Sequence, residues 1–276
     1  MSDTSIQDRI QIIKALHIAP PQAHAATYGD GQGSATVAGG SLVSFVGNLL
    51  AQQKASQTVQ FSLSPAGEAA PSDEALPNEA ARHDRQNDSG AWYDRYKSVL
   101  ENIGWTVPHF DIAELSDADT YLDVDKLLLK SAAEHLSEEE LALFQNVVES
   151  LGEAKNEVAT QLFNSQSKAS NKANFQVGVA SDGQGNTTLK IGVYFYSAEQ
   201  NIDKVLFYES GSQKTLEFRA GYHTMLLNSD VYSQVREAVL EKLGNHTKDL
   251  VEDIEIGPSL RALASPRQLP PWIRTK

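Results

Sequence analysis

The chain has 276 residues, of which 41% are hydrophobic, and it contains no cysteine. Without thiols it cannot form disulfides, zinc–thiolate sites or iron–sulfur clusters, and it has no cysteine nucleophile. Its 23 basic and 36 acidic residues give a net charge of −13. A body with this charge repels phosphate backbones and anionic lipid headgroups, so we expect no nucleic-acid partner and no membrane docking by charge alone.

Residues 1–63 are predicted to contain an N-terminal helix and an apolar segment. Apolar residues recur at helical spacing before a pair of prolines that ends the helix, namely Ile6, Ile10, Ile13, Leu16, Pro20 and Pro21. Residues 22–40 are rich in Gly and Ala and predict a loop. The apolar run Ser41–Ala51 fits either an amphipathic helix or a short buried strand, and its periodicity leaves both open.

The N-terminal sequence does not have the pattern of a secretory signal. Charged side chains interrupt Met1–Ile18, whereas a signal peptide needs a continuous apolar stretch. The sequence also lacks any run of about 18 apolar residues of the kind that spans a membrane. We therefore expect a cytoplasmic protein, with export by a route that cleaves no signal left open.

Residues 64–90 separate this first part from the main body. They consist mostly of Pro, Ala, Glu, Asp and Asn, and they predict an acidic linker or surface loop. The main α+β body is expected over 91–256, with helices over 91–165. One helical stripe begins at Trp92 and ends before Gly104, which suits a helix C-terminus. A Ser-x-x-Glu capping box at 137–140 begins another helix.

Near residue 170 the apolar residues change from helical spacing to alternation. This pattern predicts an antiparallel sheet over 173–226. A Gly-rich turn at 182–186 joins its two clearest strands in a hairpin. Two further strands are expected at Val205–Tyr208 and Thr215–Phe218.

A long helix is predicted over 229–243, with its cap at position 228 or 229. Together these elements predict an α+β fold, in which a helical N-terminal half is followed by an antiparallel β-meander with a packed C-terminal helix. Residues 257–276 form a basic, proline-rich tail that contains no acidic residue. Such a tail is either loose or laid along an acidic groove.

Three segments of the chain carry a family resemblance, namely Gly39–Val46, the group Trp92-Tyr93 with Val99-Leu100 and Ile103–Trp105, and Tyr232–Arg236 with Lys242–Gly244. Together they resemble an uncharacterised family of bacterial and fungal proteins. The resemblance covers most of residues 35–256 and leaves the acidic linker and the basic tail outside. It implies a shared fold but no activity, cofactor or catalytic residue.

The sequence carries no motif typical of catalysis or metal binding. No two of its seven histidines are four residues apart, so a helical zinc pair is absent. Four aspartates between 117 and 125 lack the Gly and Glu of an EF-hand loop, and helix capping by Asp123 explains them more simply. The Asp-Gly-Gln-Gly tetrads at 30–33 and 182–185 lack the Gly-Lys of a P-loop and predict turns. We expect no metal and no cofactor.

Three sets of residues are candidates for contact with a ligand or partner. Residues 37–51 resemble a membrane-inserting or partner-binding segment, through Leu42, Phe45, Val46, Leu49 and Leu50. A cluster of aromatic side chains could stack on a ligand, namely Trp92, Tyr96 and Trp105. The tail offers Arg261, Arg267, Trp272 and Arg274 to an acidic surface. For the first two sets, packing in the hydrophobic core is the alternative.

Two functional hypotheses follow from these features. The first is a non-enzymatic interaction protein, such as a bacterial effector or toxin component, that acts on a partner protein or a membrane, or that forms a homo-oligomer. The second is a hydrolase-like enzyme with a carboxylate-based active site, because paired acids leave little trace in one sequence.

Overall fold

The structure, a computed structural model, describes residues 4–16, 23–27, 34–38, 41–46, 85, 88–107, 113–114, 123–152, 157–183, 186–208 and 217–243. Its helices are α1 (Ile6–Ala15), α3 (Ser89–Asn102), α4 (Val124–Ala133), α5 (Glu138–Leu151), α6 (Glu157–Ser167) and α7 (Ser229–Leu243). Its strands are β1 (Ala23–Thr27), β2 (Ser34–Ala38), β3 (Ser41–Val46), β4 (Trp105–Thr106), β5 (Ala113–Glu114), β6 (Lys168–Ala169), β7 (Lys172–Gly183), β8 (Asn186–Ser197) and β9 (Glu217–Leu227). The predicted α+β class is confirmed.

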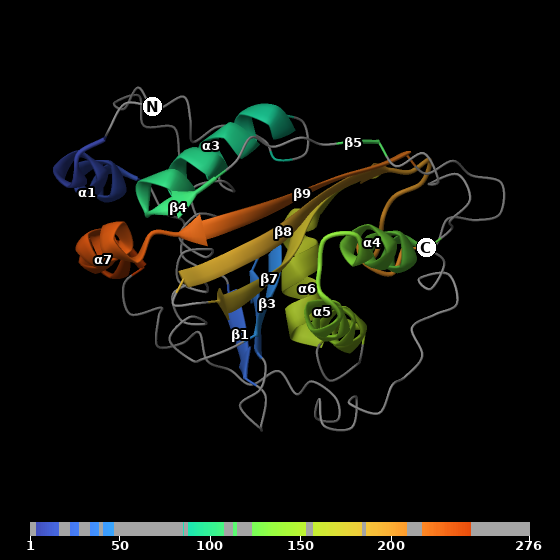
Figure 1. Ribbon diagram of the computed structural model, residues 1–276. Coiled ribbons are helices and arrows are strands. Elements are labelled where there is room, and N and C mark those ends of the chain that lie inside the picture. Colours follow the sequence, from blue (N-terminus) through green and yellow to red (C-terminus); the bar gives the residue numbers. More distant parts are fainter. Residues whose placement is uncertain are drawn as a thin grey trace, which may run out of the picture.

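One twisted sheet forms the middle of the molecule, and helices lie on both of its sides (Figure 1). Its strands run in the order β1-β2-β3-β7-β8-β9-β4, with β5 on β9 and β6 on β7. The antiparallel meander β7-β8-β9 confirms the predicted sheet, and its hairpin closes with Gly183 opposite Asn186. The sheet is mixed, however, because β3 pairs with β7 in parallel.

Four local predictions need correction or completion. Residues 22–40, expected as a loop, contain strands β1 and β2, which pair with each other. Residues 41–46 form strand β3, which settles the choice between helix and strand over that stretch. Residues 205–208 lie in a turn rather than a strand, because their apolar side chains fill the core from an irregular segment. The expected strand at 215–218 begins at Glu217 and continues to Leu227.

Three of the predicted helix ends agree with the structure in their chemistry. The Ser137 hydroxyl accepts a hydrogen bond from the backbone N–H of Glu140, whose carboxylate accepts one from the backbone N–H of Ser137. This reciprocal pair satisfies two donors that a helix N-terminus leaves without partners. Gly104 follows the end of α3 with a φ of 106°, a conformation that favours glycine. The Asn228 side chain accepts hydrogen bonds from the first turn of α7.

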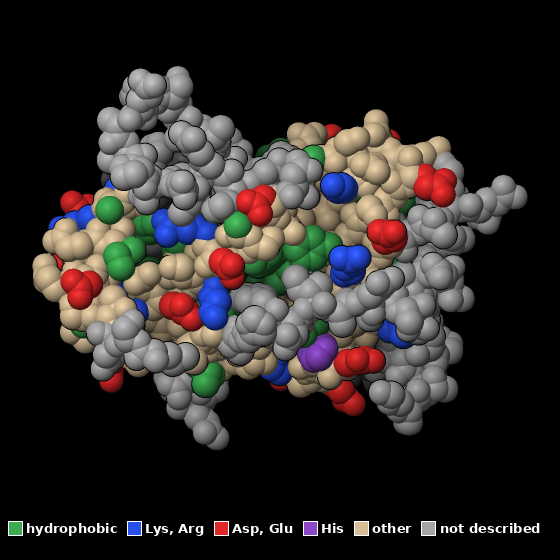
Figure 2. Space-filling view, turned by 90° about the horizontal axis from the view of Figure 1, so that it is seen from above, with side chains coloured by type: hydrophobic (Ala, Val, Ile, Leu, Met, Phe, Trp, Pro, Cys, Tyr) green, Lys and Arg blue, Asp and Glu red, His purple; other side chains and the backbone are tan. Residues whose placement is uncertain are grey.

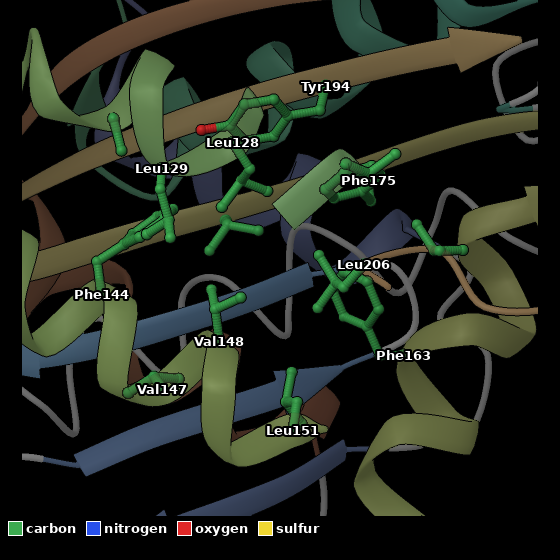
Figure 3. Close-up of a cluster of buried hydrophobic side chains, with 14 of the residues drawn as sticks. Leu128, Leu129, Phe144, Val147, Val148, Leu151, Phe163, Phe175, Tyr194 and Leu206 are labelled. Atoms are coloured by element: carbon green, nitrogen blue, oxygen red, sulfur yellow. The ribbon is translucent and has the colours of Figure 1, made fainter. Parts of the chain in front are cut away.

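Each side of the sheet has its own hydrophobic cluster. Helices α4, α5 and α6 cover one side, where Phe144, Phe163, Phe175 and Tyr194 meet aliphatic side chains (Figure 3). Helices α1, α3 and α7 contribute to the other cluster, together with Ile191, Val193 and Met225 from the sheet. Both sides of the sheet are therefore buried, which is why its central strands carry apolar residues at successive positions. In the part of the chain that the structure describes, no helix is long and apolar enough to cross a bilayer.

Candidate functional site

The most unusual buried group of the described chain is the guanidinium of Arg85, which lies just before helix α3. The Arg85 side chain is only 8% exposed, although a charged group is rarely buried without compensation. It lies over the ring of Trp92, with 4.4 Å from the guanidinium carbon to the ring centroid. This is the geometry of a cation–π contact.

Aromatic rings from one stripe of α3 surround this contact. The buried positions of the helix recur at helical spacing, with three aromatic residues followed by aliphatic ones. The rings of Trp92 and Tyr96 are stacked at 5.4 Å between centroids, with 9° between their planes. The Tyr93 ring stands nearly perpendicular to both. The aromatic side chains of α3 thus pack together on the side of the helix that faces the sheet.

Two polar side chains of strand β7 complete this group. Asn174 is buried, and its amide nitrogen donates to the carbonyl oxygen of Arg85 at 2.6 Å. Its amide oxygen accepts from the Tyr93 hydroxyl at 3.1 Å. Gln176 is wholly buried beside Tyr93, and neither of its polar side-chain atoms makes a hydrogen bond of good geometry to the described residues. We call Arg85, Trp92, Tyr93, Tyr96, Asn174 and Gln176 the arginine cluster.

The electrostatics of the cluster follow from its burial. Burial lowers the pKa of Arg85, and the neighbouring hydroxyls of Tyr93 and Tyr96 oppose this change. Burial also raises the pKa of Tyr93, while Arg85 and Gln176 oppose that rise. The guanidinium and the tyrosines therefore stabilise each other in a place where water does not.

A small open hollow lies next to the arginine cluster, at one end of β7, β8 and β9. It has a volume of about 160 Å³ and is lined by Lys172, Ala173, Phe195, Tyr196, Ser197, Glu217 and Arg219. We call it the sheet-end hollow. The ring of Phe195 connects it to the cluster, since its centroid is 5.6 Å from that of Tyr93. Figure 2 looks onto the side of the molecule that carries α3 and shows hydrophobic side chains between basic and acidic ones.

Strand register explains why these side chains meet. Ser197 of β8 lies opposite Lys172 on one neighbouring strand and opposite Glu217 on the other. Two positions further along, Phe195 lies opposite Arg219. Because side chains alternate along a strand, all five project from the same face. The hollow thus combines two exposed cations, one carboxylate, one hydroxyl and a half-buried ring.

Within the hollow, the carboxylate already has a partner. The Ser197 hydroxyl donates to the Glu217 carboxylate at 3.2 Å. The hydroxyl and carboxylate can orient a donor group of a ligand, while Lys172 and Arg219 can bind an anionic group. An aromatic or aliphatic group could pack on Phe195. A carboxylate pair of the kind that glycosidases use would need a second acid, and Glu217 is the one acid in the described lining.

The acidic residues that begin α4 are not arranged as a metal site. Asp123 occupies the N-cap position, but its side chain forms an ion pair with Lys126 instead of the predicted capping bond. Burial, together with the nearby Asp123 charge, raises the pKa of Asp125. Among the described residues, no group of three or more His, Asp and Glu side chains could hold a metal ion.

The predicted candidate residues lie in different environments in the structure. Trp92, Tyr96 and Trp105 are at most 3% exposed, so their rings belong to the core beside α3, and the first two also form the arginine cluster. Leu42, Phe45 and Val46 lie on β3, an inner strand paired on both edges, in which Val43 is buried. The other predicted residues lie outside the described residues, namely Leu49, Leu50, Arg261, Arg267, Trp272 and Arg274.

Sequence reasoning missed both the arginine cluster and the sheet-end hollow. Arg85 lies in the segment 64–90, where a linker was predicted, and no local pattern marks it as buried. Asn174 and Gln176 did carry a signal, because they are polar residues within an apolar strand. A buried amide in such a strand needs a hydrogen-bond partner, and that requirement could have pointed to this place.

Comparison with known proteins does not assign this chain to a family. No protein-family model matches the chain, and no curated protein matches it in sequence. Solved structures with some similarity include a delta-endotoxin, with a TM-score of 0.36 and 10% identity over 71% of this chain and 89% of that one. Another is the Evf virulence factor, with a TM-score of 0.36 and 13% identity over 86% of this chain and 89% of that one. At these TM-scores neither likeness establishes a common fold.

Proposed function

We propose that this protein is a non-enzymatic interaction protein that binds an acidic segment of a partner protein at the sheet-end hollow. The observation that supports the proposal is that Lys172 of β7 and Arg219 of β9 line one hollow at the end of the sheet, together with the single acid of the described lining, Glu217. The chain as a whole is strongly acidic, so a site where two cations meet departs from its surroundings. Such a local positive site attracts a carboxylate.

The form of the hollow also favours a side chain of a larger partner. At about 160 Å³ and open to solvent, it is smaller than the roughly 300–1,000 Å³ of ordinary small-molecule pockets. It can take one carboxylate together with the aliphatic stem that carries it. The stem would pack on Phe195 while the carboxylate meets Lys172 and Arg219.

Membrane action through residues 37–51 has less support than partner binding. Strand β3 pairs with β2 on one edge and with β7 on the other. Insertion into lipid would require both ladders to break and the buried Val43 to leave the core. The role of effector or toxin component stays a prediction from sequence.

The proposal can be tested with a labelled acidic peptide. We would titrate a glutamate-rich octapeptide into the isotope-labelled full chain at low salt and follow backbone amide signals by NMR. We expect shifts at positions 172, 195–197 and 217–219, and their loss at high salt, since exposed ion pairs are screened. Replacing Lys172 and Arg219 by Ala should weaken binding roughly 2- to 30-fold, because each exposed pair contributes about 0.2–1 kcal/mol.

A matched control variant removes the same amount of charge at positions away from the hollow. Lys14 of α1 and Lys204 are both exposed, and the double variant Lys14→Ala, Lys204→Ala changes the net charge equally. It should bind the peptide nearly as well as the native chain. Equal weakening in both double variants, or shifts spread over the surface, would show that only net charge matters and would refute a site at the hollow.

A further inference from the structure

The burial of Arg85 requires an explanation beyond packing. A guanidinium loses several kcal/mol of hydration when it leaves water, unless its new surroundings replace that hydration. Its position in a segment of linker-like composition gives no reason for a buried cation. The surroundings of Arg85 must therefore bind the guanidinium specifically.

Those surroundings have the features of a binding site for a planar cation. One face of the guanidinium lies against Trp92, which is itself stacked on Tyr96. Aromatic faces attract cations through their negative π-surfaces, and this attraction is strongest where water is excluded. Burial lowers the pKa of Arg85, and the nearby Tyr93 hydroxyl opposes this change. The backbone of Arg85 is held separately, by the amide of Asn174.

We propose that the rings of Trp92, Tyr93 and Tyr96 form a guanidinium-binding site that Arg85 occupies in cis. The site prefers guanidinium to ammonium, because a planar, weakly hydrated cation can stack on aromatic rings. This inference is independent of the hollow and its partner.

One consequence concerns the segment before α3. Arg85 joins that segment to strand β7, because its side chain contacts the rings of α3 while its carbonyl oxygen accepts from Asn174. The occupied site therefore fixes the chain at the point where the predicted acidic linker meets the body. Emptying the site should free this point and leave a cavity shaped for the missing group.

Chemical rescue tests the proposal directly. Arg85→Ala removes the atoms of ethylguanidinium, so this compound should refill the cavity. At about ten times its dissociation constant, it should raise the melting temperature of Arg85→Ala by roughly 3 °C or more, and it should leave the native chain unchanged. Ethylammonium at the same concentration should not do so, because it lacks the planar fork. Equal effects of the two compounds, or an effect of neither, would overturn the proposal.

A matched variant controls for the loss of any arginine beside α3. Arg95 lies on the same helix, is half-buried, and takes no part in the arginine cluster. Ethylguanidinium should not stabilise Arg95→Ala. Stabilisation of both variants would indicate general binding to the protein surface and would contradict a specific site.

A second measurement covers the case in which Arg85→Ala does not fold. Trypsin cleaves after arginine only when the side chain can enter the protease, so the site should protect the bond after Arg85 in the native chain. Trp92→Phe keeps a ring of smaller π-surface and should speed cleavage at this bond severalfold, with Val99→Ala as a control of similar destabilisation. Equal cleavage of the native chain and Trp92→Phe would contradict the proposed role of the ring.

Discussion

The two faces of strand β7 differ in what they bury. Toward α4, α5 and α6 the strand presents Ala173, Phe175, Val177 and Val179, all of which are at most 2% exposed. Toward α3 the intervening positions are Asn174, Gln176, Gly178 and Ala180, which are equally buried but polar or small. One strand thus contributes a hydrophobic surface to one layer and a polar surface to the other.

This difference separates two physical tasks. The apolar face stabilises the fold through the hydrophobic effect. This effect has no directional requirement, because burial of apolar area contributes wherever the side chains fit. The polar face stabilises one arrangement, since each buried amide and hydroxyl needs a partner at a defined place. Both candidate sites lie on the polar face, and the apolar face holds the sheet on which they are built.

The largest expected effect comes from the apolar face. Phe175 is fully buried and contacts the rings of Phe163, Tyr194 and Tyr196. Phe175→Ala should lower the free energy of unfolding by about 3–5 kcal/mol, because it removes a ring and leaves a cavity. Denaturant unfolding followed by circular dichroism measures the change. A loss below about 1 kcal/mol would show that this face is not the principal core.

An intermediate effect is expected on the polar face, where Asn174 links Tyr93 to Arg85. Asn174→Ala should destabilise the protein by about 1–3 kcal/mol, because it leaves buried groups without a partner. Tyr93→Phe removes only the hydroxyl and should cost about 0.5–1.5 kcal/mol. In the double variant the losses should not add, since both changes break the same bond, whose donor and acceptor are 3.1 Å apart. Strict additivity would mean that the bond contributes nothing.

The parts of the fold that could be predicted from sequence follow local rules. The capping box of Ser137 with Glu140 needs only three residues of separation, and Gly104 marks the end of α3 through its own backbone conformation. The alternating residues of β7 and β8 predicted their hairpin in the same way. In each case the residues whose pattern predicts the element also form its contacts.

The parts that were missed depend on distant contacts. Strands β1 and β2 consist largely of Ala, Ser and Thr, and they are ordered by pairing with each other and with β3, which itself pairs with β7 across more than 100 residues of sequence. The bond from Asn174 to Arg85 spans 89 positions. The sheet-end hollow exists only once the register of three strands is known. No local pattern encodes these distances.

The smallest expected effect tests a charged contact between the sheet and helix α5 on its apolar face. The Glu140 carboxylate accepts from Lys190 Nζ at 2.7 Å and from the backbone N–H of Ser137 at 2.8 Å. Burial favours the protonated acid, but these two donors outweigh it and lower the pKa of Glu140 below its ordinary value of 4.5. Because the folded pKa is the lower one, the stabilisation is complete above the unfolded pKa and is lost as the pH falls through the folded pKa.

Glu140→Gln keeps the shape of the side chain and removes its charge. It should therefore lower the free energy of unfolding by about 1 kcal/mol at pH 7 and by almost nothing near pH 3. Lys126→Met, which removes an exposed ion pair with Asp123, serves as the control and should change stability little at either pH. Unfolding curves at several pH values between 3 and 7 give the comparison. If Glu140→Gln loses the same amount at both extremes, its contribution comes from packing and capping rather than from the charge of its carboxylate.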